Sequence, residues 1–358
     1  MSSQPSAIPS PLPARMHRGR LHAAGDLRID EVPLPTPGEG ETLVRMTDMG
    51  LCGSDLHWFA EGGIGDAVLT EPLVPGHELA GIAVDGPFAG RRVALDPAIP
   101  CEHCALCAEG HRNLCPQVRF SGHSSTEGGL VEYKVWPTHL LHPLAEGMTG
   151  ADGSVLEPLG VALHAWDLAH ARLAHDIVVV GCGPIGLLLV QLAKAFGGGG
   201  RVVAIEPLDH RREAALRYGA DAAFAPGELD AAAAALSDPL GAHTVFEVAG
   251  NDDAIASAVT LARPGARVVL AGIPDDDRSS FGAGVARRKG LTFVMVRRMK
   301  EMYPRALALV ASGAVDVHSL VTERLPLSEA AEAFASGVAR RGLKVVIGID
   351  AGLDSAID

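Results

Sequence analysis

One stretch decides the fold of this chain: Ile177-Val178-Val179-Val180-Gly181-Cys182-Gly183-Pro184-Ile185-Gly186. Its first four residues have the apolar, β-branched composition of a buried strand, and the rest has the spacing G-x-G-x-x-G. An apolar helical pattern follows over residues 187–196, and a second β-branched strand, residues 202–205, ends at Glu206. A strand, a glycine turn, a helix and an acid in this order predict a Rossmann unit that binds a dinucleotide.

Each glycine of the turn has a physical reason. Gly181 permits the tight turn, Gly183 lets the backbone approach the pyrophosphate, and Gly186 lets the helix pack close to the strand. The helix that follows presents free N–H groups and the positive end of its dipole to the phosphates. The residues expected to contact the dinucleotide are Gly181, Gly183, Pro184, Ile185, Gly186, Glu206 and Arg211.

Glu206 also bears on which dinucleotide is bound. It lies about 20 residues past the last glycine, where a carboxylate accepts hydrogen bonds from ribose hydroxyls. The same carboxylate would repel a 2′-phosphate, so the sequence favours NAD over NADP. Arg211 and Arg212 follow closely and, as cations, would weaken this preference; their alternative interpretation is a solvated helix face.

Composition limits the class of protein. The chain has 358 residues, 47% hydrophobic but only 4% aromatic, so we expect roughly two domains with mostly aliphatic cores. Acidic residues outnumber basic ones, 43 to 30, which argues against a nucleic-acid partner. The best apolar run, residues 177–193, is shorter than the about 20 residues that a membrane helix needs, so we expect no membrane segment.

The N-terminal residues 1–15 are rich in Ser and Pro and lack the apolar core of a secretory signal. We interpret them as a disordered extension. A further hypothesis is that Met16, rather than Met1, is the true start.

Four of the six cysteines lie close together: Cys101, Cys104, Cys107 and Cys115. Their spacing, C-x2-C-x2-C-x7-C, indicates a metal site rather than a disulfide framework, and it suits a reducing cytoplasm. Four thiolates in one loop predict a closed, tetrahedral structural zinc site. An iron–sulfur cluster is the alternative, but the last gap is too long for the C-x2-C-x2-C-x3-C-P run.

Three further motifs are weak when taken one at a time. The segment Cys52-Gly-Ser-Asp-Leu-His57 follows a strand pattern, and Cys52 alone is most simply a buried cysteine. His77-Glu78 lies in a short strand-like piece, and Glu157 stands in an apolar run before Pro158, a residue typical of helix starts. Glu157 could therefore be a helix-terminal charge. A thiolate, an imidazole and a carboxylate together would form a catalytic zinc site with an open fourth position.

The chain resembles the zinc-dependent medium-chain alcohol and polyol dehydrogenases, because it has these motifs, the four-cysteine loop and the glycine turn in the same order as that family. The resemblance extends from about residue 17 to 350, and the segment 52–78 is most similar to the sorbitol/xylitol dehydrogenase branch. It implies an α/β fold. A Rossmann NAD-binding domain with a doubly wound parallel sheet would span residues 165–301. A mostly-β GroES-like catalytic domain with a structural-zinc lobe would span 16–164 and 302–358. Homodimers or homotetramers are usual in this family.

The resemblance also assigns roles to single residues. The residues implied are Cys52, His77, Glu78 and Glu157 for the catalytic zinc; Ser54 and His57 for a proton relay; and Trp58, Phe120 and Arg297 for the substrate pocket. Either Glu78 or Glu157 would be the direct third ligand. Trp58 stands where a tyrosine is usual in the polyol branch, which leaves the identity of the polyol open.

The implied reaction is oxidation of a secondary alcohol of a polyol to a ketone, with hydride transfer to NAD. The zinc would lower the pKa of the substrate hydroxyl, and Ser54 would pass its proton towards His57. Threonine- and idonate-type dehydrogenases share the motif order and are alternatives. A non-catalytic nucleotide-binding protein on this fold is the alternative from another class, but it need not keep the zinc and relay residues together. A zinc-independent quinone-reductase-like relative would lack the cysteine loop.

Overall fold

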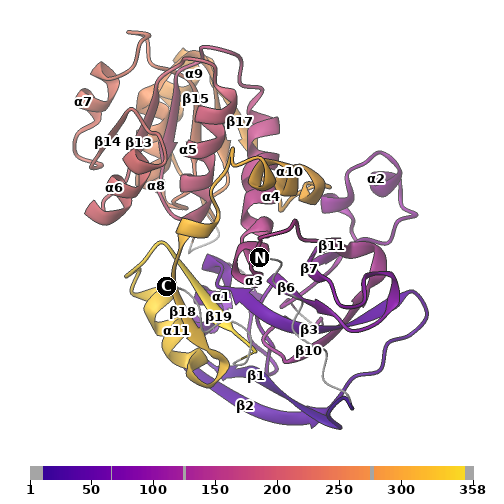
Figure 1. Cartoon of the computed structure of the whole chain (residues 1–358). Coiled ribbons are helices and arrows are strands. Elements are labelled where there is room, and N and C mark those ends of the chain that lie inside the picture. The colour runs from indigo at the N-terminus through magenta and orange to yellow at the C-terminus, as the bar shows by residue number, and fades with distance from the viewer. Residues whose placement is uncertain (1–10, 66, 124–125, 275–277, 351–358) are drawn as a thin grey trace. The chain divides into compact units, whose positions relative to one another are not determined.

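The computed structural model describes residues 11–65, 67–123, 126–274 and 278–350 (Figure 1). They form two compact units. The first unit holds the described residues up to Glu157 and from Val317 onward, and the second holds Pro158–Asp316. The boundaries expected from the sequence, 164/165 and 301/302, differ from these. Helix α4 (Leu156–Ala169) crosses the first of these boundaries. Most of α4 lies in the second unit with helix α10 (Tyr303–Ala311), where Arg305 forms a two-bond ion pair with Asp167 at 2.5 and 3.0 Å.

The second unit is built on a six-stranded parallel sheet of order β14-β13-β12-β15-β16-β17. Its strands are β12 (Ile177–Val180), β13 (Val202–Ile205), β14 (Ala222–Phe224), β15 (Ala242–Glu247), β16 (Ala262–Leu270) and β17 (Thr292–Met295). Its other helices, seen around the sheet in Figure 1, are α5 (Pro184–Phe196), α6 (Asp209–Arg217), α7 (Leu229–Ala234), α8 (Asp252–Leu261) and α9 (Ala283–Lys289). The strand order reverses beside β12, so the predicted doubly wound sheet is confirmed.

The glycine turn has the backbone geometry predicted for it. Gly181 has φ +98°, a backbone conformation that residues with a Cβ rarely adopt. A Cβ on Gly186 would lie 1.9 Å from the carbonyl oxygen of Gly181, so only glycine lets α5 pack this close to β12. Asp176 fixes the opposite end of β12, because its carboxylate accepts N–H bonds from Arg201, Ser237 and Asp238 at 2.6–2.9 Å.

The first unit is mostly β. Its main sheet has the order β11-β7-β6-β3-β19-β18, with β10 also paired to β3. The strands of the unit are β1 (Arg15–Ala23), β2 (Asp26–Pro33), β3 (Glu41–Gly50), β4 (Gly63–Ile64), β5 (Ala67–Val68), β6 (Glu78–Ala83), β7 (Arg92–Leu95), β8 (Ala98–Ile99), β9 (Arg119–Phe120), β10 (Tyr133–Pro137), β11 (Leu141–Pro143), β18 (Val321–Pro326) and β19 (Lys344–Gly348). Its α-helices are α1 (Gly53–Glu61), α2 (Ala105–Ala108), α3 (Gly150–Ser154) and α11 (Ala330–Val338).

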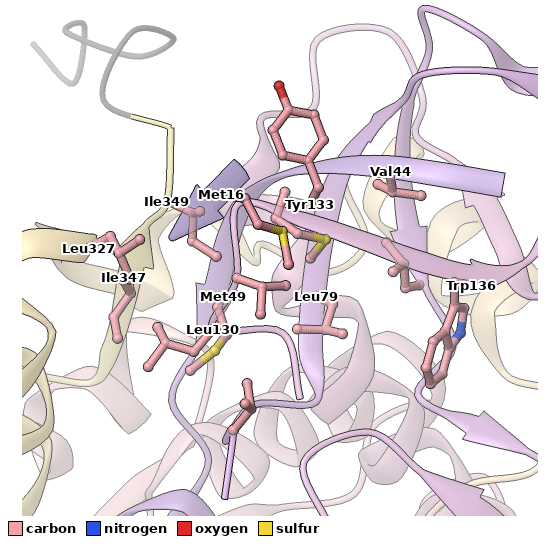
Figure 2. Packing of buried hydrophobic residues seen from close by; sticks show 14 of the residues in the cluster. Met16, Val44, Met49, Leu79, Leu130, Tyr133, Trp136, Leu327, Ile347 and Ile349 are labelled. Atoms are coloured by element: carbon pink, nitrogen blue, oxygen red, sulfur yellow. The ribbon is translucent and has the colours of Figure 1, made fainter. Parts of the chain in front are cut away.

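The core of this unit lies against the main sheet. Side chains of β1, β3, β6, β10 and β19 converge in it, among them Met16, Met49, Leu79, Tyr133 and Ile347 (Figure 2). Most of its members are aliphatic or methionine, in keeping with the low aromatic content. Within the described ranges, no helix has the length and apolar character needed to cross a membrane.

Two local expectations differ from the structure. Helix α4 already begins at Leu156, so Pro158 does not start it and Glu157 lies in its first turn. Helix α1 was not predicted; the backbone N–H of Cys52 is bound by the Asp55 carboxylate at 3.1 Å, and Gly62, at φ +72°, ends the helix.

The predicted N-terminal extension falls mainly outside the described residues, because residues 1–10 are not among them. Arg15 and Met16 already belong to β1, and Met16 is only 5% exposed. That Met16 is the true start stays a prediction.

Candidate functional site

The four cysteines of the predicted structural zinc site come together. Their Sγ atoms all lie within 4.8 Å of one another, and each is a free thiol. A tetrahedral zinc with Zn–S bonds of about 2.3 Å places its sulfurs about 3.8 Å apart, so this cluster needs only a small contraction to bind the metal. The donor set therefore fits zinc. Helix α2 begins directly after Cys104, and the Cys101 N–H donates to the Cys115 sulfur at 3.3 Å.

The thiols of this cluster have opposite pKa shifts. Backbone N–H groups, His103 first, lower the pKa of Cys101 to about 6. Burial, followed by the neighbouring sulfurs, raises the pKa of Cys107 to about 12. Several thiolates at such close range repel one another, and a bound divalent cation would offset this electrostatic repulsion.

The predicted catalytic ligands Cys52 and His77 lie around a third residue, Asp55. The Asp55 carboxylate is 1% exposed; it accepts the N–H groups of Cys52 and Gly76 at 3.1 Å each and lies 3.6 Å from His77 Nδ1. Metal-binding histidines commonly turn one nitrogen towards a carboxylate in this way. The arrangement leaves His77 Nε2 facing the hydroxyl of Ser54, 3.5 Å away.

Electrostatic coupling joins His77 to the other proposed ligands. Burial alone would lower the pKa of His77, but the charges of Asp55, Cys52 and Glu157 outweigh it and raise that pKa well above its usual value. Burial also raises the pKa of Glu157 to about 7; His77 opposes the shift and the charge of Glu78 adds to it. A thiol, an imidazole and a carboxylate thus share one water-poor region, and their chemistry fits a catalytic zinc.

Glu78 and Glu157 have different surroundings. The Glu78 carboxylate forms an ion pair with Lys344, and both side chains are 1% exposed. The pair lies against Gly50 of β3, where a Cβ would be 2.2 Å from Glu78 Oε2. Lys344 also donates to the carbonyl of Leu51 at 2.8 Å. Glu78 therefore already has a cation.

The two metal sites differ in how closely their donors gather. In the part of the chain that the structure describes, the four cysteines are the one group of three or more His, Cys, Asp or Glu residues whose ligand atoms lie within 4.8 Å. The donors Cys52, His77 and Glu157 are more widely spread.

The remaining predicted residues of the first unit lie on α1 or beside His77. The Phe120 ring packs against His77 at a tilt of 46°, with 5.2 Å between centroids. Ser54 and His57 lie one turn apart on α1, and His57 Nδ1 is 3.2 Å from Glu61 Oε1. Trp58 is 6% exposed and packs with Leu21 and Leu73, so most of its indole belongs to a small core.

The predicted dinucleotide residues meet at the carboxyl ends of β12 and β13 in the second unit. The Glu206 carboxylate, 4% exposed, accepts the N–H groups of Cys182 at 2.7 Å and Leu208 at 3.1 Å. Arg211 extends over the turn, since a Cβ on Gly183 would be 3.8 Å from its Nη1. Burial, with the charge of Glu206, raises the pKa of the Cys182 thiol, so this cysteine is an inert part of the turn. Arg297 lies in the same unit, after β17, and is itself exposed.

Sequence reasoning missed three charged residues of the catalytic region. Asp55 lies inside a motif that was noted for its cysteine and serine. Lys344 opens an apolar strand yet is 2% exposed, and a lysine in such a strand indicates a buried partner. Asp96, which raises the pKa of Glu157, had no local signal.

Comparison with known proteins identifies both units. Residues 38–146 match the alcohol dehydrogenase GroES-like domain, and residues 184–312 match the zinc-binding dehydrogenase family. The chain is 31% identical to sorbitol dehydrogenase of Bacillus subtilis over 90% of this chain and 93% of that protein. It is 32% identical to the probable D-xylulose reductase A of Neosartorya fischeri over 91% and 95% of the two chains.

A solved structure agrees with these relatives. A zinc-binding dehydrogenase of Sinorhizobium meliloti, bound to NADP, superposes with a TM-score of 0.84 at 28% identity, over 94% of this chain and 100% of that chain. The predicted combination of a GroES-like domain and a Rossmann domain is therefore confirmed. The chain belongs to the zinc-dependent medium-chain alcohol and polyol dehydrogenases and is an oxidoreductase.

Proposed function

We propose that this oxidoreductase uses NAD to oxidise a secondary alcohol of a sorbitol- or xylitol-like polyol to a ketone. One observation carries the proposal: the charges of Cys52 and Glu157 both act on the buried His77, while the Ser54 hydroxyl lies 3.5 Å from His77 Nε2. The names of the relatives, sorbitol dehydrogenase and D-xylulose reductase, support a polyol as the substrate.

Cys52, His77 and Glu157 would hold the catalytic zinc. Glu157 is preferred to Glu78 because Lys344 already neutralises the Glu78 carboxylate. When bound, zinc supplies Lewis-acid activation that lowers the pKa of an attached hydroxyl group. Asp55 orients the His77 ring through Nδ1, so that Nε2 would be the nitrogen that binds the zinc.

Ser54 would accept the proton of the substrate hydroxyl. His57, one turn later on α1 and with its side chain 26% exposed, would receive that proton and exchange it with solvent. As the hydroxyl oxygen loses its proton, the carbon that bears it gives up a hydride to the oxidised nicotinamide, and the C–O bond becomes the ketone C=O. Burial of His77 and Glu157, at 7% and 4% exposure, keeps bulk water from the reacting groups.

A substrate panel tests this proposal. Purified, zinc-analysed protein is given sorbitol, xylitol, idonate or threonine with NAD, and NADH absorbance is followed. We expect kcat/KM for one of the two polyols to exceed that for idonate and threonine at least about tenfold, which corresponds to 1.4 kcal/mol. A preference for idonate or threonine would favour the alternative dehydrogenase types. Tight NADH binding with no turnover of any alcohol would favour the non-catalytic class.

Glu206 makes NAD the proposed coenzyme. A buried carboxylate hydrogen-bonded to the glycine turn places a negative charge where a 2′-phosphate would otherwise approach. We expect kcat/KM to be at least about tenfold higher with NAD than with NADP, and the ratio to shrink in Glu206→Gln. A clear NADP preference of the wild-type protein would contradict the proposal, and would instead match the Sinorhizobium meliloti structure.

We also propose that the protein is a cytoplasmic homo-oligomer. Strand β17 ends its sheet, and Met295 at its end is 68% exposed. Ile273, 54% exposed, is a further large apolar side chain exposed on the same unit. An open apolar strand edge favours pairing with a second copy. Light scattering of the purified protein should give a dimer or tetramer mass, and a monomer mass would rule this out.

A further inference from the structure

A pocket in the first unit has no part in the proposed chemistry. Its volume is about 620 Å³, which falls in the range of about 300–1,000 Å³ typical of small-molecule sites. Strands β1, β2 and β10 and the segment before β10 form its walls. Cys52, His77 and Glu157 are not among its lining residues.

The pocket carries an excess of positive charge. Arg18, Arg119 and Lys134 line it, against a single acid, Glu127. Arg18 already pairs with Glu127 at 2.5 Å, and the Nε of Arg18 is buried without a hydrogen-bond partner. Arg119 is exposed. Arg119, together with Lys134 in its protonated form, therefore gives this hollow a local positive charge on a chain whose formal charge is −13, and that charge favours an anionic ligand.

Lys134 is placed where it can act on both a ligand and the pocket wall. Its ammonium is 4.4 Å above the Trp136 ring and donates to the carbonyls of Glu127 and Gly128 at 2.6 and 3.1 Å. Burial lowers the pKa of Lys134 to about 7, so an anion beside it would help to keep it protonated.

Apolar side chains complete the walls. Val32, Val131 and Trp136 line the pocket beside Met16 and Tyr133, two of the core residues that Figure 2 labels. The combination suits an organic anion, with its charge at Arg119 and its apolar body along the half-buried Val32 and Val135.

One wall of the pocket is joined to the segment that carries His77. The N–H groups of Gly128, Gly129 and Leu130 donate to the carbonyls of residues 74, 76 and 75 at 2.8, 3.0 and 3.1 Å. A Cβ on Gly128 would lie 2.0 Å from the carbonyl oxygen of Pro75, so the two backbones are in close contact. A ligand that shifts Gly128 therefore shifts the residues directly before His77.

We propose that this pocket binds a small organic anion, a carboxylate or phosphate monoester with an apolar body, and that its occupancy changes the turnover number through the Gly128–Pro75 contact. The kinetic part rests on the proposed function, whereas the binding part does not.

Calorimetry on the full-length, zinc-loaded protein tests the binding. Hexanoate and hexyl phosphate are the probes. Acetate, which has the charge but no long apolar chain, and hexanol, which has the apolar chain but no charge, are the controls. We expect saturable binding of at least one probe, weakened about tenfold or more in Arg119→Gln and unchanged in Arg91→Gln, a matched exposed arginine outside the pocket. No saturable binding, or equal binding by both variants, would overturn the proposal.

Initial rates then separate the pocket from the alcohol site. At saturating alcohol and NAD, the bound probe should still change kcat in the wild type, and the effect should require about tenfold more probe in Arg119→Gln. Purely competitive inhibition against the alcohol would place the probe at the catalytic zinc and overturn the proposal. Binding with no change in kcat would overturn the coupling to His77. If no alcohol is turned over at all, the proposed function fails while the calorimetric result stands.

Discussion

The two candidate metal sites of the first unit are built in opposite ways. The four cysteines come from one short loop, gather their sulfurs within 4.8 Å, and depend on no distant residue for a ligand. Cys52, His77 and Glu157 come from three separate segments and are more widely spread. Two charged residues outside the ligand set support them: Asp55, next to His77, and Lys344, paired with Glu78.

The difference indicates two roles. A closed set of four thiolates offers a metal no open position, so its binding energy goes into folding the loop. The second set combines three donor types with a nearby hydroxyl, Ser54, and three protein ligands would leave a tetrahedral zinc one open position. The first site should therefore respond to mutation in stability and the second in turnover.

The largest expected effect is on chemistry. Cys52→Ala should lower kcat roughly a thousandfold or more, because the substrate hydroxyl loses its metal activation. Circular dichroism and NADH fluorescence titration should show a folded protein with coenzyme affinity within about threefold of wild type. Retained turnover would remove Cys52 from the catalytic site.

The matching change in the cysteine loop should act on stability instead. Cys107→Ser removes one of four zinc ligands, so we expect loss of one zinc per chain and a fall of several kcal/mol in the free energy of unfolding. Thermal unfolding and metal analysis measure both quantities. If this variant lost its turnover with no change in melting, the division into two roles would be wrong.

Removing the cation beside the catalytic set should have a smaller effect on stability. Lys344→Met leaves the Glu78 carboxylate buried without its partner, which should cost about 3 kcal/mol in denaturant unfolding. The double variant Lys344→Met/Glu78→Gln removes the stranded charge and should recover most of that loss. An equal loss in both variants would show that packing, rather than the ion pair, is responsible.

The smallest effect concerns acid sensitivity next to the cysteine loop. Burial, and then the nearby Arg112 guanidinium, lower the pKa of His142 to about 4 from its usual 6.5. The folded protein thus keeps His142 neutral while the unfolded chain can take up a proton. The resulting stability is fully present above pH 6.5 and is lost as the pH falls towards 4.

Protonation of His142 should lower the free energy of unfolding by about 2 kcal/mol between neutral pH and pH 4, allowing for the partial exposure of this side chain. His142→Gln should flatten the pH dependence of unfolding between pH 6.5 and 4 relative to wild type. An unchanged slope in the variant would assign the acid sensitivity to other groups.

The sequence predicted what depends on near neighbours. The strands on either side of α5 begin and end where the apolar pattern does, because buried parallel strands are continuously apolar. The spacing of Cys101 to Cys115 likewise predicted a compact thiol cluster, because a single short loop supplies all four sulfurs.

What escaped prediction depends on residues far apart in the chain. Glu78 and Lys344 meet only because β6 and β19 flank β3, and Gly50 between them leaves room for both side chains. Nothing near Glu78 in the sequence indicates that it has a cation. The start of α1 was missed because its first residue is glycine, and the Asp55 hydrogen bond to Cys52 takes the place of a usual cap.

The most direct test of the two-site account is an anomalous-difference map recorded at the zinc edge from crystals of the purified protein. The account predicts two zinc peaks per chain. One should lie about 2.3 Å from each sulfur of Cys101, Cys104, Cys107 and Cys115, and the other about 2.0–2.3 Å from Cys52 Sγ, His77 Nε2 and a Glu157 oxygen. A single peak in the cysteine loop, or a second peak bound to Glu78 with Glu157 turned away, would contradict it.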